Sequence, residues 1–129
     1  MNEIINKINS KINELNYRLN QLHYSKKNIK FYYAEQINSI KEEIRDLKAQ
    51  LIYFSNLNDN QEIDIHGATK YFVEYYLDDL LYNKMNYHQK VKLITGKGTY
   101  TLFYSVKKYL TNENLKYKIV DNNFIIDLY

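Results

Sequence analysis

The chain opens with a long amphipathic segment. Apolar residues recur at alternating spacings of three and four from Ile5 to Leu22 and again from Ile37 to Phe54, with polar residues between them. This spacing is typical of the a and d positions of heptads, and no glycine or proline interrupts it. The pattern therefore predicts a long helical segment over residues 1–55.

The two halves of this segment are out of phase, since continuing the first register would place Gln36 and Glu43 in the core. A continuous helix would absorb the slip as a stutter, whereas a turn near Ser25–Asn28 would fold the halves into a helical hairpin. A single helix would run about 75 Å, too long for a small domain to cover. Because Ser25–Asn28 contains no helix breaker, we favour a homodimeric coiled coil through residues 1–54, with the intramolecular hairpin as the alternative.

A second pattern begins after a linker of turn-forming residues, 56–61. Short alternating runs predict strands near residues 62–66, 91–94, 117–120 and 124–128, and helical spacing predicts helices near 73–81 and 102–110. Thr69 is placed to cap the first helix, and Asn122-Asn123 is placed to form a hairpin turn. The order β-α-β-α-β-β over residues 62–129 predicts an α/β fold, an α+β two-layer sandwich with a four-stranded sheet.

The chain has only three glycines, and all of them lie in two turns between a predicted strand and a predicted helix. The first turn ends at Gly67 and carries Asp64 and His66, which leave the same face of the strand at its carboxyl end. Ligands bind at that end in open α/β sheets. A carboxylate beside an imidazole is suited to proton transfer during phosphodiester cleavage, worth about 10²–10⁴-fold in rate. In the alternative interpretation Asp64 caps a turn and His66 is a surface residue.

The second turn contains Gly96, Lys97 and Gly98, followed by Thr99. Its backbone N–H groups would form a cradle for a phosphate, and Lys97 would add a positive charge. The spacing differs from that of a nucleotide P-loop, so ATP hydrolysis is not indicated. The alternative is a plain tight turn from strand to helix.

Both turns together resemble the Smr (small MutS-related) domain family over residues 61–129. Ile63-Asp64-Ile65-His66-Gly67 is similar to the family's Leu-Asp-Leu-His-Gly, and Thr95-Gly96-Lys97-Gly98 is similar to its His-Gly-x-Gly, which some members carry as Thr-Gly-x-Gly. The resemblance implies a two-layer fold like the carboxyl-terminal domain of a bacterial translation initiation factor. It also implies catalytic roles for Asp64 and His66.

The resemblance and the local charge together predict a set of nucleic-acid-binding residues: Thr95, Gly96, Lys97, Gly98, Thr99, Lys92, Lys107 and Lys108. Two positions depart from the family pattern. Thr95 replaces the usual second histidine and so removes a proton carrier, while Phe103 stands where many members carry an arginine that contacts phosphate. Binding therefore survives these departures more securely than catalysis does.

Composition narrows the functional classes. Net charge is only +3, yet residues 90–118 hold seven lysines against one acid, whereas residues 62–79 hold five acids against one lysine. The absence of cysteine excludes disulfides and thiolate metal sites. No apolar run approaches the ~18 residues of a membrane span, and polar residues interrupt the isoleucines of the amino terminus, so no signal peptide is expected. We expect a soluble intracellular protein, cytoplasmic or nuclear, that makes no membrane contact.

Asp64, His66 and His88 do not form a metal-ligand set of recognisable spacing, so no metal ligands are assigned. The cofactor is left undetermined, with a divalent metal such as magnesium as a candidate. Our leading hypothesis is a nicking or structure-selective endonuclease acting on DNA or RNA. The alternatives are a non-catalytic nucleic-acid-binding adaptor module and a coiled-coil interaction protein.

Overall fold

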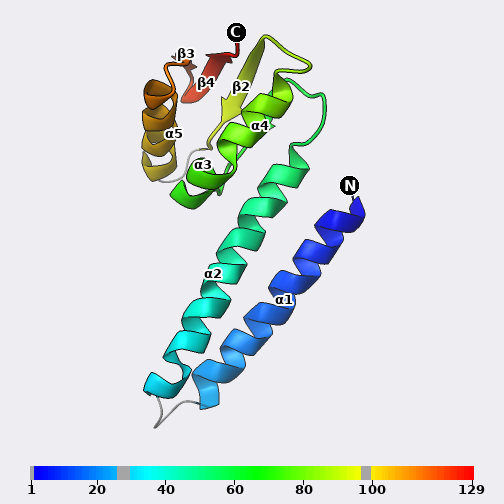
Figure 1. Ribbon diagram of the computed structural model, residues 1–129, viewed down its shortest axis with the longest axis vertical. Helices are drawn as coiled ribbons and strands as arrows, with labels where there is room; N and C mark the ends of the chain where they lie inside the picture. Colours follow the sequence, from blue (N-terminus) through cyan, green and yellow to red (C-terminus); the bar gives the residue numbers. More distant parts are fainter. Residues whose placement is uncertain (1, 26–29, 97–99) are drawn as a thin grey trace.

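The structure, a computed structural model, describes residues 2–25, 30–96 and 100–129. Two long helices, α1 (Asn2–Ser25) and α2 (Lys30–Ser55), form an arm, and the rest of the chain forms an α/β unit at one end of that arm (Figure 1). Across the described residues, no helix combines the length and the apolar character needed to cross a bilayer.

The arm is a helical hairpin, not one continuous helix. Ile8, Ile12 and Leu15 of α1 are buried against Ile40 and Ile44 of α2 within the same chain. The two apolar stripes therefore cover one another, so the reason for expecting a homodimer, a stripe left open to solvent, does not hold. The single chain does not test dimerisation through residues 1–54, and the intramolecular hairpin, the alternative, makes a monomer the expected state. Residues 26–28 of the expected turn lie outside the described part of the chain.

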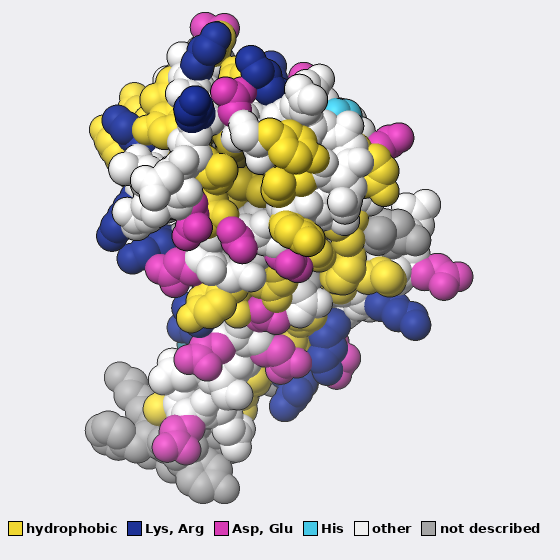
Figure 2. Space-filling view, turned by 45° about the horizontal axis from the view of Figure 1, so that its top comes forward, with side chains coloured by type: hydrophobic (Ala, Val, Ile, Leu, Met, Phe, Trp, Pro, Cys, Tyr) yellow, Lys and Arg dark blue, Asp and Glu magenta, His cyan; other side chains and the backbone are white. Residues whose placement is uncertain are grey.

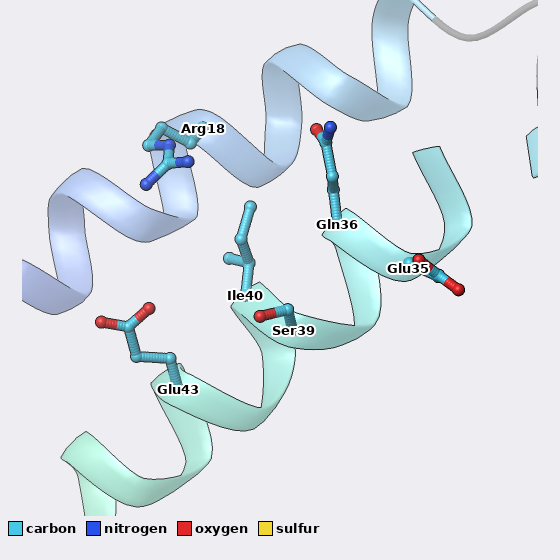
Figure 3. Close-up of a pocket in the computed structure, with 6 residues that line it drawn as sticks. All are labelled: Arg18, Glu35, Gln36, Ser39, Ile40 and Glu43. Carbon is cyan, nitrogen blue, oxygen red and sulfur yellow. The ribbon is translucent and has the colours of Figure 1, made fainter. Parts of the chain in front are cut away.

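The phase slip between the heptads is accommodated because each helix keeps its own register. Gln36 and Glu43, which a continuous helix would have buried, are exposed. Both line a hollow of about 280 Å³ between the helices, and Figure 3 shows Glu43 of α2 and Arg18 of α1 extending into the space between them. A hairpin thus avoids burying two polar side chains, which would cost free energy without hydrogen-bond partners.

The α/β unit follows the expected order, with the first helix in two pieces. Its elements are β1 (Glu62–Asp64), α3 (Lys70–Tyr75), α4 (Leu77–Lys84), β2 (Lys90–Ile94), α5 (Tyr100–Asn112), β3 (Lys116–Val120) and β4 (Asn123–Asp127). The helix predicted near 73–81 is interrupted at Tyr76, whose backbone leaves the helical region at φ −127° and ψ −27°. The strands form one sheet in the order β1-β2-β4-β3, with β1 and β2 parallel and the other pairs antiparallel.

The sheet buries one face and leaves the other open. Ile63, Leu93 and Phe124 point from three strands into the core, where they meet apolar residues of α3, α4 and α5. The alternate positions, including Asp64 and Lys92, lie on the opposite face and are exposed or partly exposed. The fold is therefore a mixed α/β sandwich of two layers, with its chemistry-bearing strand residues outside the core.

Two turn predictions need correction. The hairpin between β3 and β4 turns at Asp121 (φ 52°) and Asn122 (φ 64°), one residue earlier than the predicted Asn122-Asn123. Positive φ at both central residues is the requirement of the tight hairpin turn, and Asp and Asn tolerate it. Thr69 does occupy the N-cap position of α3, but its side chain makes no capping hydrogen bond.

Helix α2 belongs to both packing units, because its carboxyl-terminal half enters the core of the α/β unit. Ala49 is buried there, and the Asp46 carboxylate accepts hydrogen bonds of 2.6 Å from the hydroxyls of Tyr71 and Tyr76. Burial raises the pKa of Asp46, but the hydrogen bonds and the charge of Arg45 outweigh it and hold this pKa below its usual value. The carboxylate thereby fastens the arm to α3 and the residue that follows it.

The predicted linker 56–61 is fixed in place by side-chain amides and one buried lysine. Lys84 at the end of α4 is fully buried, and its ammonium donates to the Asn58 carbonyl, the Asn58 side chain and the Asn60 carbonyl at 2.7–3.0 Å. Burial lowers the pKa of Lys84. All three protons of the ammonium are used, so this lysine holds the connection between the arm and the sheet.

Candidate functional site

Asp64 and His66 lie at the carboxyl end of β1, on the open face of the sheet. Asp64 is the last residue of the strand, and its register partner on the parallel strand β2 is Ile94. The ladder continues for one residue, because the Ile65 N–H donates to the Ile94 carbonyl at 2.9 Å. Parallel pairing brings the ends of β1 and β2 together, and with them Gly67 and Gly96, the described glycines of the two turns.

The two side chains form a hydrogen-bonded pair. Nδ1 of His66 lies 2.8 Å from Oδ1 of Asp64, and the same oxygen accepts the His66 backbone N–H at 3.0 Å. Partial burial raises the pKa of Asp64, but the two hydrogen bonds from His66 and its charge outweigh this and leave the pKa lowered. An ionised carboxylate only accepts, so Nδ1 carries the proton, and Nε2 is the nitrogen that serves as a base when the ring is neutral.

The pair is open to solvent. The side chain of His66 is 72% exposed and that of Asp64 is 50% exposed. The carboxylate fixes the orientation and tautomer of the ring, as do the carboxylates that are hydrogen-bonded to the second ring nitrogen of catalytic and metal-bound histidines. A substrate can therefore reach the ring nitrogen that the carboxylate does not engage.

Asn56 holds the strand that carries the pair, a role that the sequence pattern did not predict for a residue of the linker. Its side-chain amide accepts the Asp64 N–H and donates to the Asp64 carbonyl, both at 3.0 Å, so it pairs with the free edge of β1 as another strand would. It also donates to the Ile52 carbonyl at 2.9 Å and is only 6% exposed. The sequence does show an asparagine at the end of an amphipathic helix. The residue spacing alone does not predict that its partner is Asp64, eight residues away.

Gly96 brings the second turn against His66. Its φ of +82° disfavours a residue with a side chain, and a Cβ at this position would lie 2.9 Å from the His66 Cβ. Gly67 also has a positive φ, +79°, but a Cβ there would meet nothing within 4 Å. The glycine at 96 is thus required by close approach as well as by conformation.

Thr95 does not present its side chain to a ligand. It is 6% exposed, and its hydroxyl donates to the Asn122 carbonyl at 3.4 Å, tying the end of β2 to the β3–β4 turn. The Thr95 side chain is therefore engaged within the fold, and the assignment of Thr95 as a nucleic-acid-binding residue stays a prediction. Lys97, Gly98 and Thr99, the predicted phosphate cradle, lie outside the described residues.

The predicted lysines are divided between the two layers. Lys92 shares the open face with Asp64 and pairs with Glu62 at 3.8 Å. Lys107 and Lys108 are exposed on α5, in the helix layer on the other side of the sheet. The structure therefore brings Lys92, but not the two lysines of α5, to the face that carries the Asp64–His66 pair.

The helix layer holds a hollow of about 750 Å³ between α3, α4 and α5. Its charged lining consists of three carboxylates and two lysines: Glu74, Asp78, Glu113, Lys70 and Lys108. In Figure 2 acidic side chains cross the middle of the view, and Lys and Arg side chains lie to the left, above, to the right and below them. This hollow does not offer the positive surface that a phosphate backbone requires.

The side chains of Phe103 and His88 contact other residues of the fold. Phe103, which stands where Smr members carry arginine, packs on Phe124 with ring centroids 4.8 Å apart. His88 lies near the amino end of β2, away from His66, where its Nε2 contacts the Asp59 carbonyl. Within the described part of the chain, no three His, Cys, Asp or Glu side chains are grouped so as to hold a metal ion.

Comparison of the chain with protein-family models, with curated proteins and with solved structures gives no match. The assignment of a function therefore rests on the residues of this chain and their geometry.

Proposed function

We propose that this protein binds nucleic acid and cleaves phosphodiester bonds, as a nicking or structure-selective endonuclease of the Smr type acting on DNA or RNA. The observation that carries the proposal is the exposed imidazole of His66, oriented by Asp64 and adjoined by the backbone of Gly96. A cytoplasmic or nuclear location fits this activity, because that is where nucleic acid occurs.

In this proposal His66 acts as the general base. Its Nε2 takes the proton of the attacking oxygen, from water or from a ribose 2′-hydroxyl, as that oxygen bonds to phosphorus and the bond to the leaving oxygen breaks. Asp64 stabilises the imidazolium that forms, and the proton then passes to the leaving oxygen or to solvent. Such assistance is worth about 10²–10⁴-fold.

A second candidate is a non-catalytic binding or adaptor module. The observation in its favour is Thr95, which stands where the second motif commonly has histidine and whose side chain is buried. The motifs then supply a single imidazole, and the same surface would hold a phosphate backbone without cleaving it. A role of the helical arm in binding a protein partner is the third candidate.

Nicking of supercoiled plasmid and cleavage of structured RNA, each with magnesium, with manganese and with chelator, test the proposal. We expect H66A and D64N to lose at least about 10²-fold in rate while their affinity for the substrate is retained. The matched control is H88Q, which removes an imidazole near the opposite end of β2 and should retain activity. Unaltered cleavage by H66A would overturn the assignment, and binding without cleavage by the wild type would favour the adaptor.

A further inference from the structure

Helix α2 carries a row of basic side chains beside the first glycine turn. Lys41, Arg45 and Lys48 are spaced i, i+4 and i+7 and therefore share one face of the helix, and all three are exposed. We name these three residues the basic flank of α2. None of them belongs to either apolar core.

The acids of this part of α2 point elsewhere. Glu42 and Asp46 each follow a residue of the basic flank by one position, so they are turned from it by about 100° around the helix. Of these acids, Asp46 accepts hydrogen bonds from the hydroxyls of Tyr71 and Tyr76, whereas Glu42 is exposed. The basic and acidic side chains of this part of α2 thus leave the helix in different directions, and the Asp46 carboxylate is already occupied by two tyrosine hydroxyls.

The basic flank reaches the candidate site. Arg45 and Lys48 line a small hollow together with Gly67, Ala68 and Thr69, the turn that directly follows His66. The Arg45 guanidinium is held over the Tyr71 ring at 4.5 Å from its centroid, which fixes its position in this hollow. Positive charge from the arm therefore lies beside the turn that directly follows the residue that we propose to be the general base.

We propose that the basic flank of α2 is a nucleic-acid-binding surface that holds the phosphate backbone on its way to His66. From Lys41 to Lys48 the helix rises about 10 Å, which matches roughly three phosphates of one strand at 3.4 Å each along a duplex. The arm is then part of the substrate site. This inference rests on the proposed function, and it assigns the arm a nucleic acid as its partner in place of the arm of a second chain.

The test is binding of a short labelled duplex DNA and a labelled RNA hairpin, measured by fluorescence anisotropy over a range of salt concentrations. All proteins carry H66A, so that cleavage does not interfere. The variant K41Q/K48Q removes two charges of the basic flank, K41R/K48R keeps them, and K116Q removes one exposed charge on β3, the edge strand farthest from β1.

We expect the slope of log affinity against log salt on duplex DNA to fall by about 0.9 for each phosphate that the protein no longer neutralises, hence by about 1.8 for K41Q/K48Q. K41R/K48R and K116Q should keep the slope of the H66A protein. Thermal unfolding of each variant checks that the substitutions leave the fold intact, and a slope restored by K41R/K48R separates charge from folding.

An equal slope for K41Q/K48Q and K116Q would overturn the inference while leaving the proposed function in place. A protein that binds neither probe at any salt concentration would overturn both. If the H66A proteins bind with the expected slopes but the protein that keeps His66 does not cleave, the result supports the basic flank and refutes the endonuclease proposal.

Discussion

Replacing each of two glycines by alanine isolates the contact between the second turn and His66. Gly67 and Gly96 have nearly equal φ angles, +79° and +82°. They differ in their surroundings: the added methyl group would meet nothing within 4 Å at position 67 but would lie 2.9 Å from the His66 Cβ at position 96. G67A is therefore the matched control for G96A.

The expected magnitudes follow from this difference. A left-handed conformation costs a residue with a side chain about 1–2 kcal/mol, and this cost applies to both variants. Overpacking adds about 1–3 kcal/mol to G96A alone, for a total of about 2–5 kcal/mol. At roughly 4 °C per kcal/mol for a chain of this size, the melting temperature should fall by about 4–8 °C for G67A and about 8–20 °C for G96A.

Urea unfolding and thermal unfolding measure the loss of stability. Cleavage by the folded fraction provides a second readout, because a shift of about 1 Å in a catalytic group can cost about 10²-fold in rate. Equal destabilisation by the two variants would show that Gly96 does not lie in close contact with His66. The close approach of the two turns, on which the candidate site depends, would then be wrong.

Three further predictions concern the arm: two test its attachment to the α/β unit and one tests the oligomeric state. The pKa of Asp46 is lower in the folded protein than its ordinary value of 3.8, so its contribution to stability is present above that value and is lost as the pH falls through the folded-state pKa. The D46N variant should therefore be less stable near neutral pH and should lose this part of the dependence of stability on acid pH. An acid unfolding profile of D46N that runs parallel to that of the wild type would contradict the assignment. Deletion of residues 1–55 removes Ala49 and Asp46 from the α/β unit, so that unit should unfold at a lower temperature than one that keeps residues 30–129. The full chain should run as a monomer in light scattering at tens of micromolar, and a dimer would indicate that arms exchange between chains.

The α/β unit was predictable in outline because its signals are local. Alternation placed the strands to within two residues, and the Asp64–His66 spacing placed both side chains on one face at the end of a strand. The scarcity of glycine marked two turns, and both described glycines, Gly67 and Gly96, have positive φ. A backbone conformation of this kind depends on the residue itself, so composition and position were enough.

The contacts that assemble the site were not predictable, because periodicity reports which side of an element is buried and not what covers it. The heptad stripe of residues 1–54 fits a second chain or its own other half equally well, and only the folded chain pairs α1 with α2. The pattern places Asn56 in a linker and Thr95 in a ligand-binding turn, but it does not reveal that their side chains bind the Asp64 backbone and the Asn122 carbonyl. Local patterns were thus sufficient for the elements in outline, the positive φ of Gly67 and Gly96, and the Asp-x-His pair. Which surfaces meet, including the basic flank of α2 beside His66, was settled only by tertiary packing, since such contacts join residues distant along the chain.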